Sequence, residues 1–360
     1  MGRDRTHRLP VPQSLGRSRL KTPGAFLEET IQSQPDALER LLRETPPSAA
    51  VSRLSGCSRI FLVGTGTSYH GALVGQYLLR SAGVEAWAIP AFEFANYPPH
   101  VKDDDGLVLL SHRGSKRYSQ AALEGFGGQD HWIAITGEGS ALSGPGVLHT
   151  VPQERSPVHT ASHTAAMARL AQLAIALGSP PWRAELGRLS GAVRAALQLR
   201  PQVVQALDRL QMGRVVHYVG GGPAYATALE GALKLREAAY LSTEGHDVEG
   251  ILHGPLISLS AEDSVVVIAQ PGASLERTAE LTAALHEIGT ATFAVGPSAA
   301  SLRATSVQLE TPAIDEQLAP MVNVVPLQWL ALEVSRPVGV DADSFRKEGR
   351  YAVAQTKFSL

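Results

Sequence analysis

The sequence predicts an α/β protein with two tandem domains, each built on a doubly wound parallel sheet. Short apolar runs rich in β-branched residues alternate with helical patterns, which is the order of elements in such a sheet. The alternation starts again past the middle of the chain, where residues 214–222 repeat the pattern of an apolar run and glycine loop seen in residues 59–68. A length of 360 residues suits two domains, each able to bury a core.

The first segment, residues 1–45, precedes the alternating pattern. Residues 1–23 are basic and polar, and no apolar stretch follows that would make them a secretion signal, so we expect a flexible leader. Residues 26–44 carry two apolar stripes at helical spacing, with Pro35 between them. We therefore expect two short amphipathic helices that break near this proline.

The two predicted domains span residues 46–190 and 200–335, and residues 336–360 form a tail. In the first domain we expect strands at 59–64, 85–91, 106–111 and 131–137, with helices at 69–78, around 121–123 and at 164–178. In the second we expect strands at 214–219, 263–270 and 291–297, with helices at 224–240, 274–289 and 318–336. The last helix is so apolar that we expect part of its surface to form an interface in a homodimer.

Composition excludes several classes of protein. The formal net charge is -2, so there is no basic surplus to bind nucleic acid or an anionic membrane surface. Cys57 is the only cysteine, which excludes an intrachain disulfide and makes a cysteine-based zinc site improbable. No apolar run approaches the ~20 residues that span a bilayer. We expect a cytoplasmic protein.

Two loops at strand ends could bind a phosphate group. In the first, Gly66, Thr67 and Ser68 leave a strand and open a helix, where free backbone N–H groups attract anions. The second loop, again between a strand and a helix, adds further polar and cationic side chains: Ser111, His112, Arg113, Ser115 and Lys116. Either loop alone could be an ordinary capped turn, but the pair favours an anion site. Neither matches a Walker A or dinucleotide-binding fingerprint.

The helix at 224–240 carries one charged face. Glu230, Lys234 and Glu237 share that face of a helix that is otherwise apolar on almost every side. Such a helix is buried, so its charges must be paired or must line a cleft. Glu230 and Lys234 could form a purely structural pair. Glu237 has no evident partner, and an unpaired carboxylate there would suit a general base.

Residues 244–255 are dense in histidines and carboxylates, and His253 precedes a stiff Gly-Pro turn. These neighbouring titratable side chains support an acid–base role for His253, although a lone histidine in a turn is usually structural. A metal site is the other interpretation, but the spacing matches no standard motif, so we expect neither metal nor cofactor.

Taken together, these stretches resemble the sugar-isomerase (SIS) family, with its flavodoxin-like domains. Within it they are similar to the tandem isomerase half of the glutamine–fructose-6-phosphate aminotransferases. The resemblance runs from about residue 26 to 340; its most specific stretches are residues 228–237 and 253–256, and the loop at 64–69 also matches.

The resemblance implies a set of roles. Glu237 would move a proton between C1 and C2 of an open-chain sugar, Lys234 would lie near the C1 or C2 oxygen, and His253 would assist ring opening, reaching into the partner subunit's site. An ungapped alignment also places Arg350 at the position of a lysine in the family's tail. The candidate substrate- and phosphate-binding residues are Gly66, Thr67, Ser68, Ser111, His112, Arg113, Ser115, Lys116, Thr160, Glu230 and Arg350.

The departures from the family pattern shape the functional expectation. Arg113 and Lys116 replace neutral side chains, a lysine is lost from the stretch at 159–164, and Gly2 stands where a glutaminase half needs its nucleophilic cysteine. We therefore expect a phosphosugar-processing enzyme that does not release ammonia from glutamine. Isomerase, deaminase and deglycase activities remain open, as does supply of ammonia by a separate glutaminase. The alternative from another class is a non-catalytic sugar-phosphate sensor.

Overall fold

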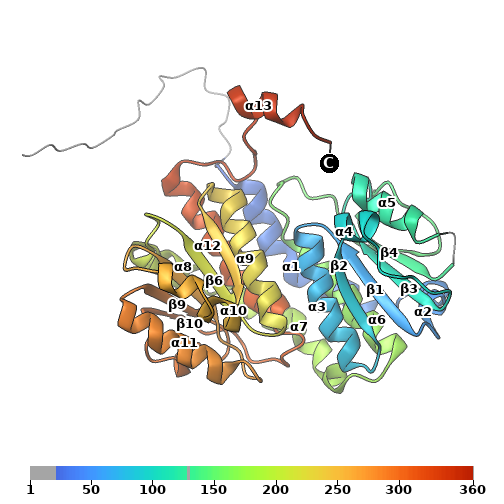
Figure 1. Ribbon diagram of the computed structural model, residues 1–360, viewed down its shortest axis with the longest axis horizontal. Helices are drawn as coiled ribbons and strands as arrows, with labels where there is room; N and C mark the ends of the chain where they lie inside the picture. The colour runs from blue at the N-terminus through green and yellow to red at the C-terminus, as the bar shows by residue number, and fades with distance from the viewer. Residues whose placement is uncertain (1–21, 128–129, 360) are drawn as a thin grey trace, which may run out of the picture.

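The computed structural model describes residues 22–127 and 130–359, which form two five-stranded parallel sheets with helices between and around them (Figure 1). The first sheet has the order β2-β1-β3-β4-β5, and the second has the order β7-β6-β8-β9-β10. Both therefore follow the 2-1-3-4-5 order of flavodoxin-like domains. This order confirms the predicted fold class.

The strands of the first sheet are β1 (Arg59–Gly64), β2 (Ala86–Pro90), β3 (Asp105–Leu110), β4 (Trp132–Glu138) and β5 (Val147–Pro152). Those of the second are β6 (Val216–Gly220), β7 (Thr243–Asp247), β8 (Ser264–Ile268), β9 (Ala291–Val295) and β10 (Val307–Leu309). The expected strands are all present. β5, β7 and β10 were not expected, because these edge strands lack the continuous apolar runs of central ones.

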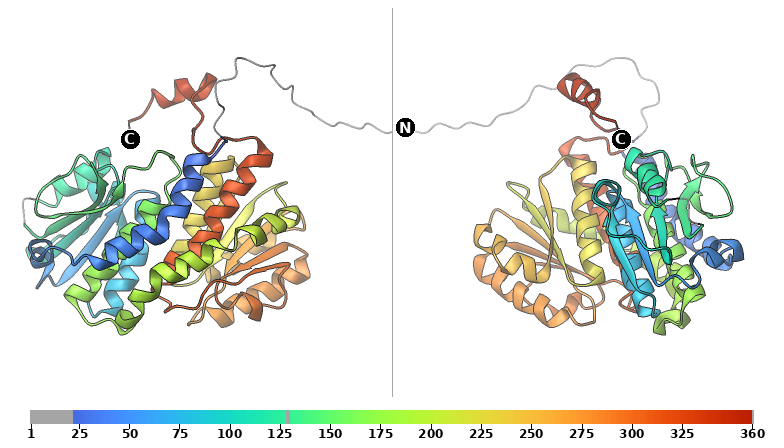
Figure 2. Two further views of the ribbon diagram at one scale, coloured as in Figure 1. Left: turned by 180° about the vertical axis from the view of Figure 1, so that it is seen from behind. Right: turned by 45° about the vertical axis from the view of Figure 1, so that its right-hand side comes forward.

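The helices begin with α1 (Ala25–Arg43), α2 (Ser48–Leu54), α3 (Thr67–Ser81), α4 (Ala91–Asn96), α5 (Arg117–Gly125), α6 (Ala161–Leu177) and α7 (Leu189–Leu197). They continue with α8 (Arg200–Ala206), α9 (Pro223–Ala239), α10 (Val248–Leu252), α11 (Leu275–Ile288), α12 (Pro320–Val338) and α13 (Gly349–Gln355). Helices α3, α9, α1 and α12 lie between the two sheets, and α5 and α11 cover outer faces (Figures 1 and 2).

The two glycine loops have the same backbone geometry. Gly66 has φ 56° and ψ -127°, and Gly222 has φ 58° and ψ -130°, a region that favours glycine. Two residues earlier, a Cβ on Gly64 would lie 2.6 Å from the Ser68 carbonyl carbon, and one on Gly220 would lie 2.3 Å from the Ala224 oxygen. Both strand-to-helix turns are thus equally tight, which supports duplication of one unit.

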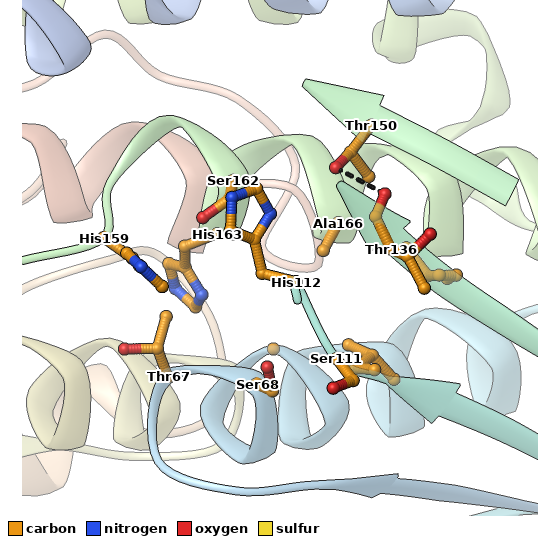
Figure 3. Close-up of a pocket in the computed structure, with 13 residues that line it drawn as sticks. Thr67, Ser68, Ser111, His112, Thr136, Thr150, His159, Ser162, His163 and Ala166 are labelled. Atoms are coloured by element: carbon orange, nitrogen blue, oxygen red, sulfur yellow. Dashed lines mark hydrogen bonds between the residues drawn. The ribbon is translucent and has the colours of Figure 1, made fainter. Parts of the chain in front are cut away.

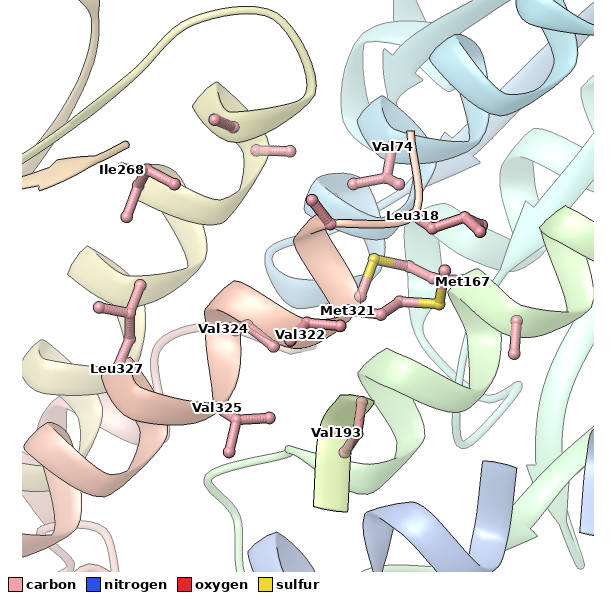
Figure 4. Packing of buried hydrophobic residues seen from close by; sticks show 14 of the residues in the cluster. Val74, Met167, Val193, Ile268, Leu318, Met321, Val322, Val324, Val325 and Leu327 are labelled. Atoms are coloured by element: carbon pink, nitrogen blue, oxygen red, sulfur yellow. The ribbon is translucent and has the colours of Figure 1, made fainter. Parts of the chain in front are cut away.

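A continuous apolar core joins the two sheets through the central helices. Figure 4 shows Met321 of α12 beside Met167 of α6, with Val74 of α3 close by, and all three belong to one buried cluster. Every residue of α12 from Pro320 to Ser335 is buried within this single chain. The expectation that α12 exposes an apolar interface is therefore wrong, because α9, α7 and α8 of the same chain cover it.

The N-terminal helix is also one element rather than two. Pro35 lies inside α1, where its missing N–H leaves the Ile31 carbonyl without its usual partner. The side-chain amide of Gln34 donates to that carbonyl at 2.9 Å, which explains why the helix continues. At the start of α1, Asp343 accepts from the backbone N–H groups of Phe26 and Leu27, so the chain after α12 caps it. Residues 1–21 of the expected leader at 1–23 lie outside the described residues.

Among the described residues, no helix is both long and apolar enough to cross a membrane.

Candidate active site

A pocket lies at the carboxyl ends of the adjacent strands β1 and β3, where the chain continues into α3 and α5 respectively. Ligands bind at this point in doubly wound sheets. Thr67, Ser68, Ser111 and His112 from the two predicted loops line the pocket. Further polar lining comes from Thr136, Thr150, His159, Ser162 and His163. Figure 3 shows the histidines of this pocket opposite Thr67 and Ser68.

Three imidazoles in this pocket are held neutral. Burial lowers the pKa of His159 and of His163 to about 4, and burial also lowers the pKa of His112. His112 accepts a hydrogen bond at Nε2 from the backbone N–H of Glu154, which places its proton on Nδ1. The pocket therefore offers hydroxyls and neutral N–H groups rather than a dense positive charge.

Glu154 fixes the other wall of the pocket. Its carboxylate accepts from the backbone N–H of Thr160 at 3.0 Å and of Ser162 at 2.8 Å, at the first turn of α6. The predicted ligand Thr160 is fully buried, and its hydroxyl donates to Thr30 of α1. Thr160 therefore connects α6 to α1, while the neighbouring His159 lines the pocket.

The cations of the second loop lie outside the lining but act on it. Arg113 and Ser115 are exposed, and Lys116 is half-buried at the start of α5. Burial, followed by the charge of Arg113, lowers the pKa of Lys116. Arg113 also contributes to the lowered pKa of His112, behind burial. These effects place the guanidinium within electrostatic range of the pocket.

A polar cluster of α9 adjoins the pocket through Thr67. Lys234 is 1% exposed, and its ammonium contacts Thr67 Oγ1 at 2.9 Å, Glu230 Oε1 at 3.2 Å and Glu237 Oε2 at 2.7 Å. An ammonium has three donors, and all three have a partner here. Lys234 therefore orients its neighbours, and the expected contact with the sugar oxygens would require it to exchange one of them.

Glu230 holds the two halves of the molecule together at this point. It is fully buried on α9, and its two oxygens contact Lys234 and Thr67 on one side and His70 Nδ1, at 2.6 Å, on the other. Burial raises its pKa, but the charges of Lys234, His163 and His70 and the hydrogen bond from His70 together outweigh burial and leave the pKa below its usual value. Glu230 is thus a permanently ionised anchor between α3 and α9.

Glu237 is the most accessible acid of this cluster, with a side chain 23% exposed. Burial raises its pKa, and this effect prevails over the opposing charge of Lys234. The expectation that Glu237 lacks a partner is wrong: Lys234 lies one helical turn away on the same face and bonds to it. Lys234 fixes the position of the Glu237 carboxylate. Burial brings the pKa of Glu237 closer to neutral pH, which suits a group that takes up and returns a proton.

Two predicted residues lie apart from this cluster in the chain. The side chain of His253 is 72% exposed and bonds through Nε2 to Glu249 Oε1 at 2.6 Å. Arg350 is exposed on α13, at the C-terminal end of the molecule (Figure 1). Among the described residues of one chain, neither His253 nor Arg350 forms a hydrogen bond or ion pair with Lys234 or Glu237.

The equivalent crevice of the second sheet holds an acidic side chain instead. Glu316 lies against the loop after β8, where a Cβ on Gly272 would be 2.3 Å from Glu316 Oε1. Burial raises the pKa of this carboxyl. A carboxyl group in this crevice disfavours a bound anion, so only the first crevice suits a phosphate group.

Sequence reasoning missed several polar residues that line or support the site: His70, Thr136, Thr150, Glu154, His159, Ser162 and His163. A signal existed for His70, which directly follows the recognised glycine loop and its tyrosine. For His159, Ser162 and His163 a signal also existed, because they lie in the stretch at 159–164 from which only Thr160 was chosen. For Thr136, Thr150 and Glu154 the sequence offers little, because they lie outside both candidate phosphate loops.

Comparison with known proteins identifies the family of the chain and agrees with its fold. The family model of the SIS domain matches residues 53–177 and 213–335. Glutamine–fructose-6-phosphate aminotransferase (isomerizing) of Methanothermobacter thermautotrophicus is 29% identical over 328 residues, covering 88% of this chain and 55% of that protein. The Gloeobacter violaceus protein of the same name is also 29% identical, with coverages of 89% and 57%. The chain spans about half the length of these curated relatives.

Solved structures share the fold across the whole of their chains. The C-terminal domain of glucosamine-fructose-6-phosphate aminotransferase from Francisella tularensis superposes with a TM-score of 0.80 at 21% identity, covering 89% of this chain and 98% of that one. Glucosamine-6-phosphate deaminase from Thermotoga maritima gives 0.75 at 21% identity, with coverages of 89% and 97%. The tagatose-6-phosphate ketose/aldose isomerase from Escherichia coli gives 0.74 at 23%, with coverages of 91% and 98%. With its two matched copies of the domain, this chain belongs to the SIS-domain family.

Proposed function

We propose that the protein is an enzyme that processes a phosphorylated sugar or amino sugar by moving a proton between C1 and C2. One observation carries this proposal: Glu237 is a partly exposed carboxylate with a raised pKa, held by the buried Lys234 beside a pocket of hydroxyls and neutral imidazoles. A protein that only binds a sugar phosphate has no need for such a carboxylate. The alternative function, a non-catalytic sugar-phosphate sensor, is therefore less favoured.

The phosphate group binds at the first crevice. Ser68 and Ser111 line it, and Ser68 lies in the first turn of α3, where the N-terminal end of the helix favours an anion. Arg113 and Lys116 add positive charge near its mouth, which the neutral histidines alone would not supply. A phosphate at this point leaves the sugar carbons free to extend towards α9, because Thr67 belongs both to the pocket and to the Lys234 cluster.

The chemical step needs one base that takes and returns a proton. The Glu237 carboxylate removes the proton from C2 of an open-chain aldose, and the electron pair forms a C1–C2 double bond as the aldehyde oxygen gains a proton. The resulting enediol returns to the ketose when the Glu237 carboxyl delivers a proton to C1 and the C2 hydroxyl loses its own. Lys234 holds Glu237 in place and opposes the rise in its pKa.

The same first step serves isomerisation and loss of an amine from C2 of an amino sugar. Relatives of this fold carry both names, an isomerase and a deaminase. We propose the aldose–ketose interconversion as the core activity, since it needs only the groups named above. Loss of an amine additionally needs water at C2.

Assembly as a homodimer completes the proposal. His253 is exposed and bonds to Glu249 rather than to the Lys234 cluster, so we propose that it acts on a sugar ring in a partner subunit's site. In that position its imidazole would carry the proton that opens the ring.

The test is a panel of hexose and hexosamine 6-phosphates, assayed for ketose, for ammonia and for binding. Ketose formation without ammonia supports isomerisation, and ammonia release selects the deaminase variant. Binding of a sugar phosphate without turnover, and without solvent-hydrogen exchange at C2, would refute the enzymatic proposal. Unphosphorylated sugars serve as the matched control for the phosphate site.

A further inference from the structure

A second group of chemically capable side chains lies on the far face of the second sheet. His217 is on β6, and Glu244 and His246 are on its parallel neighbour β7, where Glu244 pairs in register with His217. Alternation of side chains along a strand puts these three on one face. The opposite face carries Tyr218, which contacts Gly231 of α9. The three side chains are therefore separated from the Lys234 cluster by the sheet.

The three ligand-type atoms lie at the spacing of a tetrahedral metal site. His217 Nδ1 is 3.1 Å from His246 Nε2, His246 Nε2 is 3.3 Å from Glu244 Oε2, and His217 Nδ1 is 3.8 Å from the same oxygen. Bonds of about 2.0–2.1 Å to a tetrahedral zinc ion put neighbouring ligands about 3.3 Å apart. The triangle already present needs adjustments of only a few tenths of an ångström at each edge.

We propose that His217, Glu244 and His246 bind a divalent ion of the zinc type, with a solvent molecule as fourth ligand. Two imidazoles and one carboxylate are a ligand set that zinc favours. The spacing within residues 244–255 matches no standard metal motif, so the sequence alone predicts no metal site here. The structure adds the missing ligand from a strand almost thirty residues earlier.

Burial and access both suit an ion here. His217 is buried, with 4% of its surface exposed, and its ring stacks on that of His246 at a centroid distance of 5.3 Å. Glu244 is 56% exposed, which leaves a path from solvent. Polar side chains often occur on edge strands such as β7 to prevent aggregation. That explanation does not extend to His217, which lies on the inner strand β6.

The ion would connect the edge strand β7 to its neighbour β6, directly before the segment that carries His253. β7 ends at Asp247, whose side chain caps α10, and α10 leads directly to His253. A metal bridge between β6 and β7 would therefore reduce local opening of residues 243–253. This inference does not depend on the proposed function, since it concerns a different face of the sheet.

The experiment titrates Zn²⁺ into the full chain after removal of metals with a chelator, followed by calorimetry. We expect one ion per chain with a dissociation constant on the order of 1 μM or tighter. His246→Ala should weaken binding by at least about 100-fold, and Glu244→Gln, an exposed and structurally safe change, by at least about 10-fold. His286→Ala on the exposed side of α11 is the matched control and should bind zinc normally.

Two readouts besides affinity complete the test. Co²⁺ added in place of zinc should show the intense visible absorption of a four-coordinate ion, and this band should be absent in His246→Ala. Zinc should slow amide hydrogen exchange in residues 243–253 of the wild type but not of the variant. Absence of zinc binding, or zinc affinity that His246→Ala and Glu244→Gln leave unchanged in folded protein, would overturn the proposal. So would equal loss in His286→Ala.

Discussion

Replacing Lys234 by methionine tests the central claim about the α9 cluster, that one buried cation holds two carboxylates. Methionine keeps most of the side-chain volume but removes the charge. Glu230 would then be a fully buried carboxylate without its main counter-charge, retaining only Thr67 and His70. Breaking a buried pair in this way costs about 3–5 kcal/mol. We expect the free energy of unfolding, measured with urea, to fall by that amount.

The same change should shift the pH dependence of activity. In the wild type, burial raises the pKa of Glu237 and Lys234 opposes that rise. Without Lys234, only the charge of His70 opposes burial and the charge of Glu230, so the pKa of Glu237 rises further. A base must be deprotonated, so activity is lost as pH falls through that pKa. The acid limb of kcat should therefore move to higher pH by about 1–3 units.

The controls separate charge pairing from general damage. Arg43→Met removes a cation from an exposed helical pair with Glu39 and should change the free energy of unfolding by less than about 1 kcal/mol. Adding Glu230→Gln to Lys234→Met removes the stranded charge and should recover stability, with a coupling of about 1–3 kcal/mol. If Lys234→Met costs less than about 1 kcal/mol and leaves the acid limb unmoved, the electrostatic account of the cluster is wrong.

Four further outcomes are expected. Glu237→Gln should still bind sugar phosphate but lose solvent-deuterium exchange at C2 by about 10²-fold or more; near-normal exchange in mass spectra of the recovered sugar would remove Glu237 from the mechanism. Arg113→Ala should weaken binding of 6-phosphate sugars in calorimetry and leave unphosphorylated sugars unaffected, while equal losses would give the loop another role. Mixing inactive His253→Ala with inactive Glu237→Gln should restore about a quarter of wild-type activity, because about half of the dimers are mixed and each has one intact site; no recovery despite proven subunit exchange, or a monomer in light scattering, contradicts the shared site. Gln34→Leu should lower the free energy of unfolding by about 1–3 kcal/mol, since the Ile31 carbonyl loses its substitute donor, and an unchanged urea midpoint would show that Pro35 needs no compensation.

Local patterns in the sequence were sufficient for the fold class. Strands such as β1 and β8 are buried on both faces, so their sequences are continuous apolar runs. Such runs can be identified as strands from the sequence alone. The tight glycine loops gave the positions where each strand turns into a helix. The charged face of α9 was also visible, because helical spacing alone puts Glu230, Lys234 and Glu237 together.

Only the tertiary structure decided how these elements meet. The sequence could not show that Gln34 replaces the hydrogen bond lost at Pro35, or that helices of the same chain cover α12. Nor could it show that His159 and His163 lie opposite Thr67, since they come from a distant segment. Periodicity shows which side of an element is apolar. A binding site, such as the proposed metal site of His217, Glu244 and His246, depends on distances between segments that are far apart in the chain. Those distances are set by packing between elements, which no local pattern contains.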